Sequence, residues 1–218
     1  MKTLSLLLIL ISLLRSEIST PSPQIHPTEA FSCSVDPFQD PLILTIHTRH
    51  QKAVDGDKNE VKLLAVDLEK LTKEQPHNSL LLAYLGSVYT LQSRDAFPGP
   101  GKLELLKKGG KTLDQAVDQD PTNLATRFIR AVNYYELPRI FNKRSTSRED
   151  FQLIVTQMET PRCPQHFSDE TRQAIYYYAG LSYKQLKQPE QAIKAWECGL
   201  KIYPYSLLGK KIEKELKR

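Results

Sequence analysis

Gln173–Ser206 reads QAIYYYAGLSYKQLKQPEQAIKAWECGLKIYPYS, and this stretch decides the fold of the chain. Small and aromatic residues recur in it at the spacing of two amphipathic helices, with a turn at Lys187–Pro189 between them. Gly180 and Ala192 are small where the two helix backbones would approach each other, and aromatic side chains would fill the space beside them. The positions that carry the pattern are Ala179, Gly180, Tyr183, Ala192, Trp196, Gly199 and Pro204.

This order of small, aromatic and proline positions over about 34 residues resembles a tetratricopeptide repeat (TPR). The resemblance implies an antiparallel helix pair that stacks on further pairs, with the first helix of each pair on a concave face. It also implies that a protein or peptide partner binds along this face. It indicates the fold more specifically than the function, because one fold carries many kinds of binding surface.

The same register recurs earlier in the chain. Gly86 and Ala131 occupy the position of Gly180, and each is followed three residues later by a tyrosine. Leu207–Arg218 is expected to form a final helix that covers the apolar flank of the last pair. No segment alternates with the period of a β-strand. We therefore predict that residues 41–218 form an all-α superhelix, a right-handed TPR-like solenoid of about four helix pairs with a C-terminal capping helix.

The first pair is expected to begin at Asp40 and Pro41, as an N-cap followed by a first-turn proline.

Two later segments depart from the repeat. The second unit is about eleven residues longer than the period, and the surplus is centred on an insert at Ser93–Lys102. In the third unit, Leu137–Arg148 is expected to be an irregular polar connection, with a helix from about Arg148 onwards. Long connections often carry function, so both inserts are candidates for it.

The N-terminus has the features of an export signal. An apolar run, Leu6–Leu14, follows a lysine and is too short to anchor the chain in a bilayer. We expect residues 1–19 to be a signal peptide and residues 20–40, rich in proline and serine, to be an extended lead-in. A buried N-terminal helix is the less favoured alternative, because no polar residues pattern this run. The mature chain is expected to lack a membrane span and to be periplasmic or secreted.

The chain carries a formal net charge of +5 at pH 7. Its basic and acidic residues are interspersed, so nucleic acid is not an expected partner. Three cysteines in an exported chain permit one disulfide, and Cys163 with Cys198 is the favoured pair. Free buried thiols remain an equal alternative.

No stretch carries a recognisable catalytic, metal or cofactor site. Gly109–Thr112 resembles the end of a phosphate-binding loop, but it lies inside a predicted helix and lacks the first glycine. Cys163 and His166 have a possible metal-ligand spacing, but no second pair accompanies them. We therefore expect a protein that is not an enzyme and that needs no cofactor or metal.

Two surfaces are candidates for binding. Transfer of the repeat register puts apolar and aromatic residues on the concave face, where they could anchor a peptide or could pack together as core. Basic residues cluster around the third unit, in a run similar to a segment of exported bacterial TPR-like proteins of unassigned role. The groove candidates are Phe128, Val132, Tyr135, Tyr177, Leu181 and Lys184, with Leu80, Ala83, Ser87 and Thr90 in the second unit; the basic candidates are Arg127, Arg130, Arg139, Lys143 and Arg144.

Arg127 and Arg130 lie on one side of a predicted helix. We favour structural salt bridges to Asp95, Asp118 or Asp120 over the binding of an acidic partner. The sequence as a whole indicates a non-catalytic, exported adaptor or scaffold that binds a protein or peptide in the cell envelope through its groove. The alternative is an exported helical-repeat carrier of an apolar small molecule for a transport system.

Overall fold

The computed structural model describes residues 36–160 and 167–218. The predicted signal peptide and most of the predicted lead-in lie outside these residues. Within the described ranges the chain forms α-helices and two short 3-10 helices, and no strand. The α-helices are α2 (Pro41–Val54), α3 (Lys58–Glu74), α4 (Ser79–Asp95), α5 (Pro100–Gln119), α6 (Leu124–Glu136), α7 (Arg144–Met158), α8 (Asp169–Gln185), α9 (Pro189–Ile202) and α10 (Leu207–Leu216); the 3-10 helices are η1 (Pro37–Gln39) and η2 (Arg139–Phe141).

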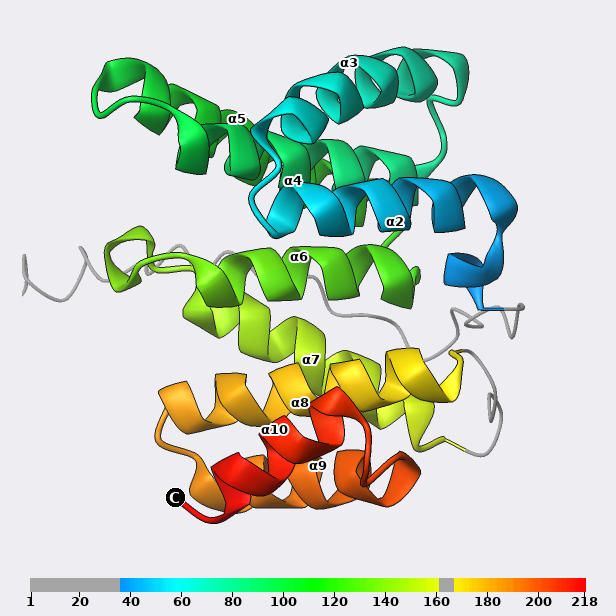
Figure 1. Cartoon of the computed structure of the whole chain (residues 1–218), viewed down its shortest axis with the longest axis vertical. Coiled ribbons are helices and arrows are strands. Elements are labelled where there is room, and N and C mark those ends of the chain that lie inside the picture. Colours follow the sequence, from blue (N-terminus) through cyan, green and yellow to red (C-terminus); the bar gives the residue numbers. More distant parts are fainter. Residues whose placement is uncertain (1–35, 161–166) are drawn as a thin grey trace, which may run out of the picture. The chain divides into compact units, whose positions relative to one another are not determined.

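The helices pack in consecutive pairs: α2 with α3, α4 with α5, α6 with α7, and α8 with α9. The first helices also contact one another in order, α2 with α4, α4 with α6, and α6 with α8. The last helix, α10, packs against α9 and α8, and its Ile212 is fully buried (Figure 1). This arrangement confirms the predicted all-α fold of four helix pairs with a final covering helix.

Polar side chains fix where most of these helices begin. Asp40 accepts hydrogen bonds from the backbone N–H groups of Leu42 (2.9 Å) and Ile43 (3.1 Å), and Pro41 follows it at the first helical position, as predicted. These bonds satisfy amide groups that have no partner within the helix. Asp57, Asn78, Asn123, Ser168 and Ser206 cap α3, α4, α6, α8 and α10 in the same way.

Glycines allow close approach within two of the pairs. A Cβ atom on Gly86 would lie 2.9 Å from the backbone nitrogen of Leu113, and one on Gly109 would lie 2.8 Å from the carbonyl oxygen of Gly86. A Cβ atom on Gly180 would overlap the indole of Trp196. The small residues of the repeat therefore lie at helix crossings, as the sequence pattern predicts.

The predicted insert at Ser93–Lys102 is mostly helical, which corrects the prediction of a long loop. Only four residues, 96–99, separate α4 from α5, and the surplus residues lengthen the two helices. Gly99 adopts a φ of 154°, which favours glycine, and Pro100 occupies the first turn of α5. Proline and glycine thus mark the start of a helix here.

The predicted connection at Leu137–Arg148 is also shorter than expected. It contains η2, and α7 already begins at Arg144. Ser147 is buried in the first turn of α7, and its hydroxyl donates to the carbonyl oxygen of Ala131 (2.8 Å). This contact with α6 explains why a polar stretch is helical.

The end of the predicted lead-in is ordered. Phe38 in η1 is buried, and its ring contacts those of Phe128 (centroids 6.2 Å apart) and Phe167 (6.1 Å). Asp36 accepts a hydrogen bond from the backbone N–H of Ser168 (2.7 Å), at the start of α8. Residues 36–40 therefore belong to the packed unit.

Candidate functional site

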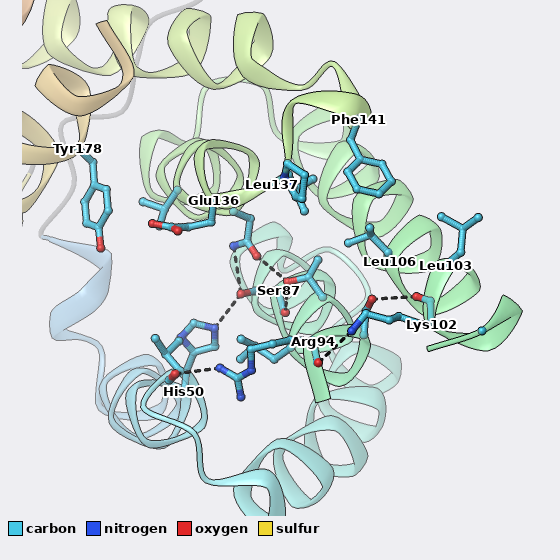
Figure 2. Close-up of a pocket in the computed structure, with 18 residues that line it drawn as sticks. His50, Ser87, Arg94, Lys102, Leu103, Leu106, Glu136, Leu137, Phe141 and Tyr178 are labelled. Carbon is cyan, nitrogen blue, oxygen red and sulfur yellow. Dashed lines mark hydrogen bonds between the residues drawn. The ribbon is translucent and has the colours of Figure 1, made fainter. Parts of the chain in front are cut away.

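A cavity of about 790 Å³ lies against the inner helices of the stack, and Figure 2 shows it in close-up. Its volume is within the range of small-molecule binding sites, which is roughly 300–1,000 Å³. The first helices of all four pairs contribute to it. Their lining residues are His50 and Val54 from α2, Ser87, Thr90, Leu91, Ser93 and Arg94 from α4, Val132, Asn133 and Glu136 from α6, and Tyr178 from α8.

One side of the cavity is apolar. It is formed by the first turns of α5 and by the segment that follows α6, the two segments that depart from the repeat. Leu103, Leu106 and Phe141 lie together on this side in the close-up (Figure 2). Leu137 and Pro138 extend the same wall. An apolar group that entered the cavity would be shielded from water here.

Hydrogen-bonded polar side chains form another part of the lining. The Nε2 atom of His50 lies 2.7 Å from the hydroxyl oxygen of Ser87. Asn133 donates to the same hydroxyl (3.1 Å) and accepts from the hydroxyl of Thr90 (2.9 Å). The Ser87 hydroxyl can accept from Asn133 and still either donate to or accept from Nε2 of His50, depending on the tautomer of the imidazole. This chain of bonds holds α2, α4 and α6 together below the cavity.

Burial keeps His50 neutral. Burial, and after it the charge of nearby His47, lowers the pKa of the imidazole to about 4. An imidazole with so low a pKa is a weak general base at neutral pH. The contact between Ser87 and His50 is therefore better suited to fixing the helices than to activating a nucleophile.

The low pKa of His50 predicts loss of stability in acid. The folded protein binds this proton only below about pH 4, whereas the unfolded chain binds it below its ordinary value of 6.5. Acidification from pH 7.5 to 5 therefore favours the unfolded chain, at a cost of about 2 kcal/mol. Burial also lowers the pKa of His47, which acts in the same direction. Urea unfolding at the two pH values measures the loss.

A matched pair of variants isolates the part that His50 contributes. We expect His50→Gln to lose less stability than the wild type between pH 7.5 and 5. His77 is exposed, so His77→Gln should keep the full acid loss. Equal acid losses in all three proteins would contradict the assignment to His50.

The two cations at the cavity already have partners. Arg94 donates to the carbonyl oxygens of Ala53 and Val54 (2.9 Å each) and pairs with Asp95 (2.8 Å). The ammonium of Lys102 donates to the carbonyl oxygen of Arg94 (3.2 Å). Both side chains therefore bind carbonyl groups at the C-terminal ends of α2 and α4, where cations are favoured.

Glu136 differs from these cations, because its carboxylate forms no hydrogen bond or ion pair with any residue that the structure describes. It is the last residue of α6. Glu136 is an exposed residue, yet partial burial disfavours the charged form and raises the pKa of the carboxyl group. Among the charged side chains that line the cavity, this carboxylate is the one without a polar contact in the described part of the chain.

Three tyrosines lie beside Glu136. The ring of Tyr178 packs edge-on against Tyr135 (centroids 6.2 Å apart) and against Tyr177 (5.2 Å). Burial, and after it the charge of Glu136, raises the pKa of Tyr178 to about 12. Of these rings only Tyr178 lines the cavity, and the other two support it.

The structure divides the predicted groove residues. Val132 lines the cavity, as do Ser87 and Thr90 of the second unit, whereas Leu80 and Ala83 are core. Phe128 is covered by the rings of Phe38 and Phe151. Leu181 packs against the C-terminal core, and Lys184 pairs with Glu215 (2.7 Å). Tyr135 and Tyr177 lie next to the site through Tyr178.

Sequence reasoning missed His50, Asn133, Glu136 and Tyr178. The repeat register selects Tyr177 from three consecutive tyrosines, and Tyr178 is the one that reaches the cavity. Glu136 is four residues after Val132 and three after Asn133, and these helical spacings could have indicated that it shares a face with them. No pattern in the sequence indicates that His50 meets Ser87.

The basic residues form an ion-pair network, not a free patch. Arg127 and Arg130 both bind Asp150, with nitrogen–oxygen distances of 2.7 and 2.8 Å, and Arg130 also approaches Asp114 (3.3 Å). The predicted partners, Asp95, Asp118 and Asp120, were wrong. Lys143 pairs with Asp114 as well (3.0 Å), Arg139 is exposed in η2, and the Nε atom of Arg144 finds no acceptor among the described residues.

The predicted disulfide stays a prediction, because Cys163 lies outside the described residues. Cys198 forms no disulfide within the described part of the chain. In that same part, no group of three or more histidine, cysteine or acidic side chains could hold a metal ion. None of the described helices combines the length and the apolar character that a membrane crossing requires.

Comparison with known proteins gives few matches. No family model matches the chain, and neither does any curated protein. Among solved structures, the crystal structure of MamA is similar, with a TM-score of 0.46 and 17% sequence identity over 73% of this chain and 86% of that chain. What this chain binds must therefore be inferred from the cavity itself.

Proposed function

We propose that this chain is a non-catalytic, exported binding protein that takes an apolar segment of a partner protein into the cavity of its inner helices. The observation that carries the proposal is the cavity of about 790 Å³, lined by the first helices of all four pairs. It exceeds the size of a single side chain, so several neighbouring apolar side chains of one peptide segment could enter together. In helical repeats such inner surfaces form extended binding faces.

The polar lining supports binding more than catalysis. Ser87 is almost fully buried, and its hydroxyl oxygen receives a hydrogen bond from Asn133. A nucleophilic serine requires a base that is poised near neutral pH, which the low pKa of His50 does not provide. These groups hold the helices in place around an apolar space.

Filling the cavity tests the proposal. Leu106 lines the apolar wall, so Leu106→Trp would occupy the space that a partner needs. We expect at least about a tenfold loss of affinity for partners that the wild type captures from an envelope extract and that bind again as purified proteins. The envelope is the compartment to which the proposed export would deliver the chain.

Leu63→Trp is the matched control, because Leu63 is 57% exposed on α3 and does not line the cavity. It should bind as the wild type does. If Leu106→Trp also binds the same partners with unchanged affinity, they do not use the cavity and the proposal is wrong.

A second candidate is the carriage of an apolar small molecule, which the cavity volume favours. Native mass spectrometry of the purified protein distinguishes the two candidates. A carrier should show a bound small molecule that is missing from Leu106→Trp and retained in Leu63→Trp. A protein-binding site should show only the mass of the bare chain in each of the three samples.

A further inference from the structure

We propose that Glu136, Tyr178 and the adjoining Tyr135 and Tyr177 form a subsite for an organic cation, and that the ligand is an apolar chain with an alkylammonium group. We call these four residues the cation subsite. The inference rests on the proposed function, since it names the chemistry of the ligand that the cavity would take. The ammonium would lie at Glu136 and the apolar chain against the wall of Leu103, Leu106 and Phe141, which is on the other side of the cavity in Figure 2.

The position of Glu136 favours the binding of a cation. Its carboxylate is at the C-terminal end of α6, where the helix dipole is negative and repels it. It has no cationic partner among the described residues, and partial burial at the cavity raises the pKa of its carboxyl group. An acidic group held at such a point in a cavity is a typical feature of a binding site.

The C-terminal ends of α2 and α4 each bind a cationic side chain, and the C-terminal end of α6 binds none from the described residues. Arg94 binds the terminal carbonyl groups of α2, and Lys102 binds a carbonyl group at the end of α4. By contrast, α6 has no basic residue in its last turn and carries Glu136 there. A ligand cation would provide at α6 the positive charge that the protein itself provides at α2 and α4.

The tyrosines would also attract a cationic ligand. The electron-rich faces of aromatic rings attract cations, and groups of such rings bind ammonium ligands. Burial is the largest cause of the raised pKa of Tyr135, Tyr177 and Tyr178, but the charge of Glu136 contributes at all three. Glu136 and Tyr178 line the same cavity, and Tyr135 and Tyr177 pack against the ring of Tyr178, so one ammonium group could contact both the carboxylate and an aromatic ring.

The same contacts argue against an anionic ligand. Arg94 is already engaged by Asp95 and two carbonyl groups, and Lys102 by one carbonyl group. A carboxylate ligand would have to compete with these bonds and would meet the repulsion of Glu136. The carboxylate of Glu136 thus favours a cation at its end of the cavity, and the opposite wall favours an apolar chain.

Three probes with the same chain separate the contributions of head group and tail. We would measure the binding of n-octylammonium, 1-octanol and octanoate at pH 7.5 by NMR titration. The ammonium is expected to bind at least about tenfold more tightly than the other two. Glu136→Gln should remove about tenfold of its affinity and change that of octanol less than twofold.

Glu149→Gln is the matched control, because Glu149 is an exposed carboxylate on α7 that does not line the cavity. It should bind all three probes as the wild type does. Two blocked peptides, Ac-Leu-Lys-Leu-NH2 and its norleucine analogue, test whether a lysine side chain is the source of the cation. A preference for the lysine peptide that Glu136→Gln abolishes would favour a protein partner, and a preference confined to octylammonium would favour a free amine.

The possible failures are distinguishable. If octanol and octanoate bind as tightly as octylammonium, and Leu106→Trp weakens all three, the cavity binds ligands but the cation subsite is wrong. A loss of octylammonium binding in Glu149→Gln as large as that in Glu136→Gln would also overturn the assignment. If neither the probes nor the peptides bind, but Leu106→Trp still weakens the binding of a captured partner, the subsite is wrong and the proposed function stands.

Discussion

Replacing Asp150 by alanine is expected to lower the free energy of unfolding by about 3–5 kcal/mol. Its side chain is 1% exposed and accepts hydrogen bonds from Arg127 (2.7 Å) and from two nitrogen atoms of Arg130 (2.8 Å each). Removal of the carboxylate leaves the buried Arg130 with only the longer contact to Asp114 (3.3 Å). The loss reflects the uncompensated charge more than the value of the ion pair. Urea unfolding at pH 7 measures it.

The neighbouring residue provides the control. Glu149 is exposed, and its contact with Arg148 is long (3.5 Å), so Glu149→Ala should change the free energy of unfolding by less than about 0.5 kcal/mol. Arg130→Met combined with Asp150→Ala should recover part of the loss, because it removes the buried charge that was left unpaired. A loss below about 1 kcal/mol in Asp150→Ala would show that Asp150 does not hold the network together.

The architecture could be predicted because each unit repeats local rules. Gly86, Ala131 and Gly180 share one register, and Asp40 with Pro41 marks a helix start that the structure confirms. The prediction of a long loop at Ser93–Lys102 was wrong because proline and glycine are common both in loops and in the first turns of helices. Pro100 occupies the first turn of α5, which sequence composition does not distinguish from a loop.

The site was harder to predict because its contacts join residues far apart in the chain. Arg127 and Arg130 were expected to form salt bridges, but their partner depends on how α7 packs against α6, and Asp150 was not considered. Phe128 was assigned to the groove, yet Phe38, from a segment ninety positions earlier, covers it. A repeat register says which helix face is inner, and it does not say what else packs there.

The last prediction concerns Gly180, in the stretch that decides the fold. Replacing it by alanine should destabilise the wild type but stabilise a variant that lacks the indole of Trp196. A Cβ atom there would overlap the indole of Trp196, which is buried and donates to the carbonyl oxygen of Tyr177 (3.1 Å). Gly180→Ala is therefore expected to cost about 1–3 kcal/mol of unfolding free energy, through overpacking. Trp196→Ala alone should cost about 3–5 kcal/mol, because it removes a large buried side chain.

The double variant shows whether these two residues act on each other. Once the indole is gone, alanine at position 180 has space, and its better helix propensity should make Gly180→Ala stabilising by up to about 1 kcal/mol in the Trp196→Ala background. Gly101→Ala is the control, since nothing lies within 4 Å of a Cβ atom there, and it should be neutral or slightly stabilising in both backgrounds. Urea unfolding of the four proteins completes the cycle. Equal costs of Gly180→Ala with and without Trp196 would mean that the glycine is needed for another reason than this contact between α8 and α9.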